Sequence, residues 1–471
     1  MSERSLLPLR SRRQGSILVV VLVALATSFT VAAAIVGLSF SVAQLGSRAV
    51  ARASALHLAE AGVHYQRWRI AHRPDDASEV LGARTLAFRD ATGRAAGTVT
   101  ITVSTPDTCT GRTTISATAA PSARAPQMRT VTTAYGKPSL ASYAFLTNTT
   151  LSFGGSGTID GRIHANSGIR MDANQNTIAS SAVATYTCGS GQGCASTGEE
   201  RPGIWGAGSG NTQGLWRFPV QGVSFSAITA DLRTLRDTAN TSGVLLPPSG
   251  AYGYYLKFKS NGTVDIHRVT NLQRPVWSYD GERWNYESHD LSGVPTVQRT
   301  HAIPQESCGA GNLIVVEDNV WVDGIVHGRV TVVARSPDTT TRNARIFLNG
   351  SLTLQDAKTD AVGLIAQGDV QFPLVLPDDI TISGVLIAQR GRIFRPYYPS
   401  TYRPWYIRSS LRLNGSLITN GVAATTWVDQ NGNVVSGFRG GSNAFDARYA
   451  LDPPPFIPAR SEFAFLKWNE K

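Results

Sequence analysis

The sequence contains four cysteines, and their spacing limits the covalent chemistry that they can support. Cys188 and Cys194 enclose the short loop GSGQG, whose glycines let a small ring close, so this pair is the expected disulfide of an exported chain. The state of Cys109 and Cys308 stays open: each is free, or the two pair with one another. A structural metal site needs more ligands than this spacing offers, so no metal is expected.

Two short segments repeat the pattern D-G-x-x-H, with Asp160 before His164 and Asp323 before His327. A neighbouring carboxylate and imidazole can ligate a metal or share a proton. The alternative, which we favour, is that both segments are equivalent turns of one structural repeat. The Asp then occupies a tight turn before Gly, and the His lies on the strand that follows.

Common catalytic motifs are missing from the sequence, including G-x-S-x-G, the P-loop and H-E-x-x-H. Coiled β folds that act on polysaccharides usually use clustered carboxylates, but Asp172, Asp323 and Asp369 are spread over separate segments. We therefore expect no enzymatic activity and no cofactor. A β-helical enzyme acting on polysaccharides is the alternative.

Aromatic residues are concentrated in the segment RPYYPSTYRPWYIR, residues 395–408. Prolines keep such a segment extended, and aromatic rings with polar tips suit sugar or peptide surfaces. The candidate partner surface consists of Tyr397, Tyr398, Tyr402, Trp405 and Tyr406. The segment WSYDGERWNY, residues 277–286, has the same character. The alternative is that the rings of both segments cover the flank of the domain.

The composition favours an exported, β-rich protein. Only 16% of the 471 residues are charged and 45 are glycine, which suits many turns better than a cytosolic α/β enzyme. A chain of this length can hold more than one domain. The net charge of +11 comes from scattered residues, which suits an anionic envelope. Because there is no continuous basic stripe, no nucleic acid is expected as a partner.

The element that must position the rest is one long helix, predicted over residues 16–73. No charged residue lies between Arg13 and Arg48, whereas about 20 apolar residues suffice to cross a bilayer. Residues 16–47 are therefore expected to span the membrane, and the rest of the helix is amphipathic. Arginines in the basic leader, residues 1–15, keep the N-terminus in the cytoplasm and the C-terminal domain outside. A signal peptide cleaved near Ala34 is the alternative.

This N-terminus resembles a type IV pilin, because the leader SRRQG is followed directly by the apolar helix. The resemblance implies that a prepilin peptidase cuts after Gly15 and makes Ser16 the mature N-terminus. Further along, the segment AEAG resembles PilX-type minor pilins; it consists of Ala59, Glu60, Ala61 and Gly62. Major pilins of the family carry a glutamate at the fifth mature position, where this chain has Val20. This departure points to an accessory subunit rather than a shaft subunit.

Downstream of the helix, the sequence predicts a mainly β chain and hence an α+β fold class. Residues 74–142 hold three segments with period-two alternation, which indicate a small antiparallel sheet packed on the helix. Residues 143–471 repeat short apolar segments after glycines, which indicates an irregular parallel β-helix with insertions at about 172–310 and 395–409. A β-sandwich is the alternative. The final apolar segment, residues 463–468, is expected to cap the coil.

Together these features predict a minor pilin-like structural subunit of a type IV pilus or a related pseudopilus. A single pass through the inner membrane anchors it before assembly, and its β domain is then displayed on the pilus or cell surface for assembly priming or adhesion. The expected partners are other pilins, the prepilin peptidase, and a host or envelope glycan or protein. The alternative is a membrane-anchored surface adhesin that never enters a filament.

Overall fold

The chain forms two compact units in the computed structural model. One unit comprises Met1–Thr105, Thr114–Ala134 and Trp468–Lys471, and the other comprises Pro106–Thr113 and Tyr135–Lys467. The residues that the structure describes are 16–72, 80–107, 110–122, 127–155, 157–195, 198–208, 213–225, 232–306, 309–337, 342–460 and 462–471.

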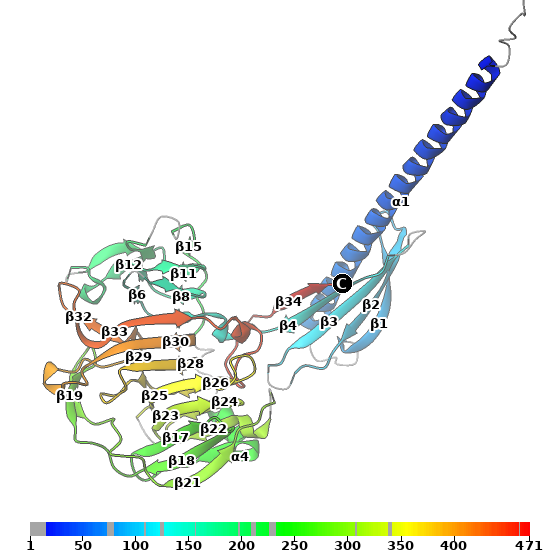
Figure 1. Ribbon diagram of the computed structural model, residues 1–471. Helices are drawn as coiled ribbons and strands as arrows, with labels where there is room; N and C mark the ends of the chain where they lie inside the picture. The colour runs from blue at the N-terminus through cyan, green and yellow to red at the C-terminus, as the bar shows by residue number, and fades with distance from the viewer. Residues whose placement is uncertain are drawn as a thin grey trace, which may run out of the picture. The chain divides into compact units, whose positions relative to one another are not determined.

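The first unit begins with α1 (Ser16–His72), an unbroken helix of 57 residues (Figure 1). Its apolar half includes serines and threonines, whose hydroxyls donate to carbonyls one turn earlier. Thr27 donates to Val23 at 3.0 Å, and Ser28 donates to Ala24 at 2.7 Å. Because these bonds satisfy the hydroxyls within the helix, the polar residues do not need water and are compatible with an apolar environment.

The first unit also contains most of a five-stranded sheet, in the order β1-β2-β3-β4-β34. Its strands are β1 (Gly82–Arg89), β2 (Ala95–Val103), β3 (Thr113–Pro121), β4 (Arg129–Gly136) and β34 (Ala464–Glu470). β1 pairs with β2, and β2 with β3, in antiparallel register. Val99 and Ile101 of β2 are buried, while Thr98, Thr100 and Thr102 beside them are exposed. This alternation is typical of a sheet with one face on a core.

The position of β34 corrects a prediction from the sequence. Residues 463–468 were expected to cap the coil, but β34 instead joins the N-terminal sheet beside β4. The peptide groups of Thr130 and Lys471 exchange two hydrogen bonds, of 3.0 and 2.9 Å. The local pattern of a strand does not say which distant strand it pairs with, so the sequence could not distinguish the two places.

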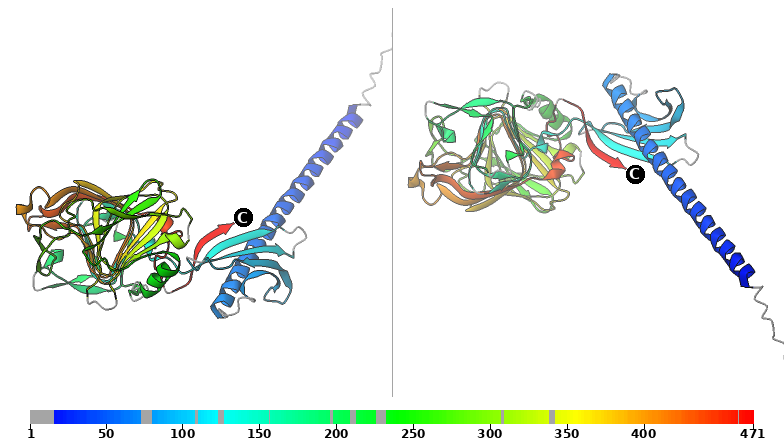
Figure 2. Two further views of the ribbon diagram at one scale, coloured as in Figure 1. Left: turned by 90° about the horizontal axis from the view of Figure 1, so that it is seen from below. Right: turned by 90° about the horizontal axis from the view of Figure 1, so that it is seen from above.

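The second unit is a coil of short strands whose main ladders are parallel, and Figure 2 shows it along the direction in which the strands stack. Its first ladder runs in the order β16 (Val244–Leu246), β22 (Leu313–Val316), β24 (Arg329–Ala334), β26 (Ala361–Ala366), β28 (Asp379–Ala388), β30 (Ile407–Thr419), β5 (Phe145–Thr147), β8 (Ile163–Ala165), β11 (Ala179–Ser181) and β15 (Trp216–Arg217).

Two further parallel ladders complete the turns of the coil. The second runs in the order β17 (Gly253–Lys259), β23 (Val320–Val326), β25 (Ile346–Leu354), β27 (Val370–Gln371), β29 (Ile393–Phe394) and β31 (Ala423–Ala424). The third joins the remaining parts of β23, β25, β28 and β30 to β33 (Val434–Ala444).

A column of apolar side chains explains why the strands stack. Each strand of the first ladder contributes one residue in register, and these are Val244, Ile314, Val332, Leu364, Leu386, Leu417, Phe145, Ile163, Ala179 and Trp216. All but Trp216 are buried in one core cluster, and Trp216 packs against it. Strands buried on both faces need such apolar runs, so each strand depends on its neighbours for stability.

The stacking order of the strands departs from their order in the chain. β5, near the start of the unit, pairs with β30, near its end, and Leu417 lies opposite Phe145. In Figure 1 the late strands β30 and β33 accordingly lie beside the early strands β6 and β8. The early strands therefore cover an edge of the ladder that would otherwise present unpaired peptide groups.

The second unit also contains shorter strands and an α-helix. Two short parallel sets are β6 (Leu151–Phe153), β9 (Ile169–Met171) and β14 (Ile204–Trp205), and β7 (Thr158–Ile159) and β10 (Asn174–Gln175). Antiparallel partners are β12 (Thr185–Cys188) with β13 (Glu199–Pro202), β18 (Thr263–Val269) with β17 and β21 (Val297–Ala302), β19 (Val276–Tyr279) with β20 (Trp284–Glu287), and β32 (Thr426–Val428) with β33. Helix α4 (Leu232–Ser242) buries Leu235 and Ala239.

The predicted fold class is confirmed: a long N-terminal helix, a small antiparallel sheet and a mainly β domain. The ladders are parallel, whereas the alternative β-sandwich is built from antiparallel sheets. Within 172–310, the stretch expected to interrupt the repeats, β11, β15, β16 and β17 take part in the ladders. Between β29 and β30, the other expected insertion contains one short 3₁₀ helix, Ser400–Tyr402.

Candidate functional site

The first half of α1 presents a continuous apolar surface to its surroundings. Among the described residues, α1 is the one helix that is long and apolar enough to cross a membrane, judged by length and composition. Its exposed large apolar side chains are Ile17, Leu18, Val19, Val20, Val21, Leu22, Val23, Leu25, Phe29, Val31, Ile35, Val36, Leu38, Phe40, Val42, Leu45 and Val50. A surface of this size does not remain in contact with water, so lipid or other apolar side chains must cover it.

The predicted processing point lies at the start of this helix. Gly15 lies outside the described residues, and Ser16 is the first residue of α1. Val20 stands at the fifth position from Ser16 and its side chain is 64% exposed. The N-terminal turns of α1 therefore carry no carboxylate that could pair with an amine of a neighbouring chain.

The second half of α1 packs on the sheet of the first unit. Ala51, Ala55, Ala59, Val63 and Gln66 recur at intervals of three or four residues and are all buried. This spacing places them on one face of the helix. The side-chain nitrogen of Gln66 donates to the carbonyl of Val80 at 2.7 Å, which gives this buried polar side chain a partner at the end of the apolar stripe.

The AEAG segment lies at the centre of that contact. Ala59 is fully buried, and a Cβ atom added to Gly62 would lie 2.6 Å from Cγ1 of Val99 and 3.2 Å from Cβ of Ala117. Ala61 is partly buried. Glu60 is partly buried, and its carboxylate lies 3.3 Å from Nδ1 of His57. In this chain the motif therefore allows close approach of helix and sheet through two small residues.

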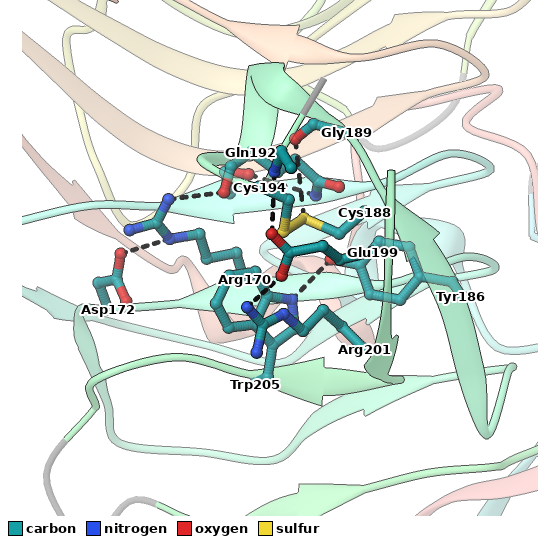
Figure 3. The surroundings of a disulfide bond; sticks show 12 residues. Arg170, Asp172, Tyr186, Cys188, Gly189, Gln192, Cys194, Glu199, Arg201 and Trp205 are labelled. Atoms are coloured by element: carbon teal, nitrogen blue, oxygen red, sulfur yellow. Dashed lines mark hydrogen bonds and ion pairs between the residues drawn. A yellow bond between two sulfur atoms is a disulfide. The ribbon is translucent and has the colours of Figure 1, made fainter. Parts of the chain in front are cut away.

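Cys188 and Cys194 form a disulfide in the structure, with a Cα–Cα distance of 5.8 Å (Figure 3). Cys188 ends β12 and is buried. Beside the disulfide, Arg170 binds Asp172 at 2.7 Å and the carbonyl of Gln192 at 2.6 Å, which ties the loop to the coil. Cys109 and Cys308, whose pairing the sequence leaves open, lie outside the described residues.

The candidate surface at 395–408 is only partly available to a partner. Tyr398 is 2% exposed, and the guanidinium of Arg395 lies over its ring, with 5.2 Å between Cζ and the ring centroid. Burial raises the pKa of Tyr398 and lowers the pKa of Arg395 to about 10. The prediction that Tyr398 contributes to a partner surface is therefore wrong: the side chain belongs to the core.

The other four aromatic residues of the segment lie at or near the surface. Trp405 is 37% exposed, and Tyr397, Tyr402 and Tyr406 are partly buried. The hydroxyl of Tyr402 accepts a hydrogen bond of 2.7 Å from the backbone of Trp277, so the segment holds the hairpin of β19 and β20. On that hairpin Trp277, Trp284 and Tyr286 are at least half exposed. The segment 277–286 therefore presents more accessible aromatic surface than 395–408.

In the two D-G-x-x-H segments, each acidic and imidazole side chain has its own partner. Nδ1 of His164 lies 2.9 Å from the hydroxyl of Ser180, whereas Nδ1 of His327 lies 3.2 Å from Asp360. Asp323 accepts a hydrogen bond of 2.8 Å from the hydroxyl of Tyr255. Among the described residues, no cluster of three His, Cys, Asp or Glu side chains has the arrangement of a metal site.

A cavity of about 680 Å³, which the sequence patterns do not reveal, opens in the second unit. Its lining is polar, with carboxylates and arginines from several connections of the coil. Nε2 of His289 and Nη1 of Arg345 lie 3.3 and 3.4 Å from the carboxylate of Glu287. The hydrogen bond from His289 and the positive charges lower the pKa of Glu287 to about 2. Charged residues that recur in the turns between apolar repeats were the available signal.

No protein-family model matches the sequence, and no curated protein matches it. Among solved structures, the chain is similar to the crystal structure of the competence-associated pilin ComZ from Thermus thermophilus. That match covers 89% of this chain and 97% of that chain, at 13% sequence identity and a TM-score of 0.29. A TM-score of this size does not establish a shared fold.

Proposed function

We propose that this protein is a minor pilin-like structural subunit of a type IV pilus or a related pseudopilus. The observation that carries the proposal is the division of α1 into two halves. The first half is apolar and exposed around its whole circumference, and the second half is seated on a sheet through Ala59 and Gly62. Such a helix can be anchored in lipid before assembly and covered by other apolar helices afterwards.

In this proposal the protein acts by assembling with other pilins. A prepilin peptidase removes the leader after Gly15, and α1 leaves the inner membrane to pack among the helices of other pilins. Helices with small and apolar residues pack closely, so the same surface serves lipid and protein in turn. The β coil, which is outside the membrane, is displayed for assembly priming or adhesion and has no enzymatic role.

The residue at the fifth mature position favours an accessory role over a shaft role. Val20 cannot pair with the N-terminal amine of a neighbouring subunit, so this chain lacks an interaction that would repeat along a shaft. A carboxylate in lipid would be costly, and its absence also leaves the anchor stable in the membrane. The protein is therefore proposed to occur in few copies, at a tip or in a priming complex.

Mass spectrometry of the mature N-terminus tests this proposal. In cells with an active prepilin peptidase, the first residue should be Ser16, and deletion of the peptidase should leave the leader attached. Gly15→Leu should block cleavage in the same way and prevent incorporation into filaments. An uncut N-terminus in peptidase-competent cells would contradict the proposal and favour the membrane-anchored adhesin.

A further inference from the structure

The cavity of the second unit lies along the corner where the coil passes from the first ladder to the second. Five connections of this kind contribute to its lining: Tyr252 between β16 and β17, Asn319 between β22 and β23, Arg342 between β24 and β25, Asp369 between β26 and β27, and Arg392 between β28 and β29. Adjacent strands lie about 4.8 Å apart, so five coils extend the cavity over roughly 19 Å. This form suits an elongated ligand.

One wall of the cavity is the hairpin of β19 and β20. Ser278 and Asn285, which lie opposite one another, line the cavity, whereas Tyr286 is 59% exposed on the other face of the hairpin. The backbones of Tyr279 and Tyr397 exchange two hydrogen bonds of 2.9 Å and fix the hairpin to the coil. The wall is therefore formed before any ligand binds, which reduces the entropy cost of binding.

The carboxylates of the cavity are held in place by the protein. Asp318 accepts hydrogen bonds of 3.0 and 2.6 Å from the amide and hydroxyl of Ser249, and Asp369 accepts one of 2.8 Å from the amide of Arg392. An ionised carboxylate has about four acceptor positions, so each keeps capacity for a ligand. They are fixed acceptors whose geometry does not have to change on binding.

Arginines supply donors in the same lining. The side chain of Arg283 is 79% exposed and lies 3.8 Å from Asp280, so most of its five N–H donors point to solvent. Arg342 is also exposed. The aromatic ring of Tyr252, which is 50% exposed, adds an apolar face at one end.

The alternation of acceptors and donors identifies the class of ligand. A sugar hydroxyl both donates and accepts, so it can use carboxylates and guanidiniums side by side. A phosphodiester backbone only accepts, so it could use the arginines but not the five carboxylates of the lining, Asp280, Glu287, Glu317, Asp318 and Asp369. The C–H face of a pyranose ring can stack on Tyr252. We propose that this cavity binds a linear oligosaccharide that lies across successive coils.

This proposal is independent of the assembly of α1, because all its residues belong to the second unit. The test uses the full chain in detergent micelles and two probes, cellohexaose as a neutral oligosaccharide and hexagalacturonate as an acidic one. Calorimetry should detect saturable binding of at least one probe. Tyr252→Ala should weaken that binding about tenfold, as expected for the loss of a stacked ring.

Tyr286→Ala is the matched control, because this exposed tyrosine lies on the outer face of the hairpin. It should leave the dissociation constant within about twofold of the wild-type value, which is a small free-energy change. Arg342→Gln should weaken binding of the acidic probe more than binding of the neutral one, because the variant removes a positive charge from the lining.

Three outcomes would overturn the proposal. The first is the absence of binding of either sugar at millimolar concentration while the variants and the wild type melt at the same temperature. The second is equal loss of affinity in Tyr252→Ala and Tyr286→Ala, which would place the sugar elsewhere. The third is tighter binding of a single-stranded dT oligonucleotide than of either sugar, with Tyr252→Ala reducing it, which would assign the cavity to nucleic acid.

Discussion

Gly62 of α1 and Val99 of β2 approach so closely that even a methyl group does not fit between them. A Cβ atom on Gly62 would lie 2.6 Å from Cγ1 of Val99. By contrast, a Cβ atom on Gly46 of the same helix would meet nothing within 4 Å. Gly62 thus lies in the packed half of α1 and Gly46 in its exposed half, so variants at the two positions can be compared.

Gly62→Val should destabilise the first unit by about 1–3 kcal/mol, the usual cost of overpacking a well-packed contact. Gly46→Val is the matched control and should leave the unfolding midpoint nearly unchanged, because open space surrounds that position. Thermal unfolding of the full chain in detergent, followed by circular dichroism, measures both. Equal midpoints for Gly62→Val and the wild type would show that the helix does not pack on β2 at this residue.

Tyr398→Ala should reduce the free energy of unfolding by about 3–5 kcal/mol, because it removes a large buried side chain from the core. Trp405→Ala, which truncates a 37% exposed ring of the same segment, should cost much less. Denaturant unfolding monitored by fluorescence compares the two. If Tyr398→Ala retained wild-type stability but lost binding of a partner, the original assignment of Tyr398 to a contact surface would be restored.

Replacing Cys188 and Cys194 together by alanine should lower the stability of the β12–β13 loop by about 2 kcal/mol, since a small ring constrains the unfolded chain only modestly. Limited proteolysis should then cut between Thr185 and Pro202, whereas the wild-type loop should resist until reductant is added. Non-reduced peptide mapping provides a direct check. Recovery of Cys188 and Cys194 as alkylated free thiols from native protein would contradict the assignment.

The carboxylate of Glu287 should make the second unit sensitive to acid. Its pKa is lowered from 4.5 to about 2, chiefly by the hydrogen bond from His289. A lowered folded-state pKa stabilises the protein above 4.5, and this stabilisation is lost as the pH falls towards about 2. Glu287→Gln should therefore flatten the loss of stability between pH 4.5 and 2, measured as the denaturation midpoint at each pH. Identical pH profiles for the variant and the wild type would refute this role.

The sequence by itself was sufficient for features that depend on neighbours along the chain. The charge-free run before Arg48 and the amphipathic pattern after it predict a helix over residues 16–73, and the structure has one at Ser16–His72, because helix hydrogen bonds close within the segment itself. A glycine-rich loop between Cys188 and Cys194 predicts their disulfide for the same local reason. Apolar segments that recur after glycines likewise indicate the mainly β domain, since each segment has the local pattern of a strand.

Tertiary structure decided everything that depends on partners far away in the chain. The pairing of β30 with β5, and of β4 with β34, leaves no local mark, because any strand of suitable pattern can pair with any other. The burial of Tyr398 rather than Trp405 depends on which side of the segment faces Arg395. The polar cavity exists only because stacking brings the turns of five coils into one line. Hydrophobic period and composition predict the strands and their buried faces. Register and stacking order decide which polar side chains meet in the cavity.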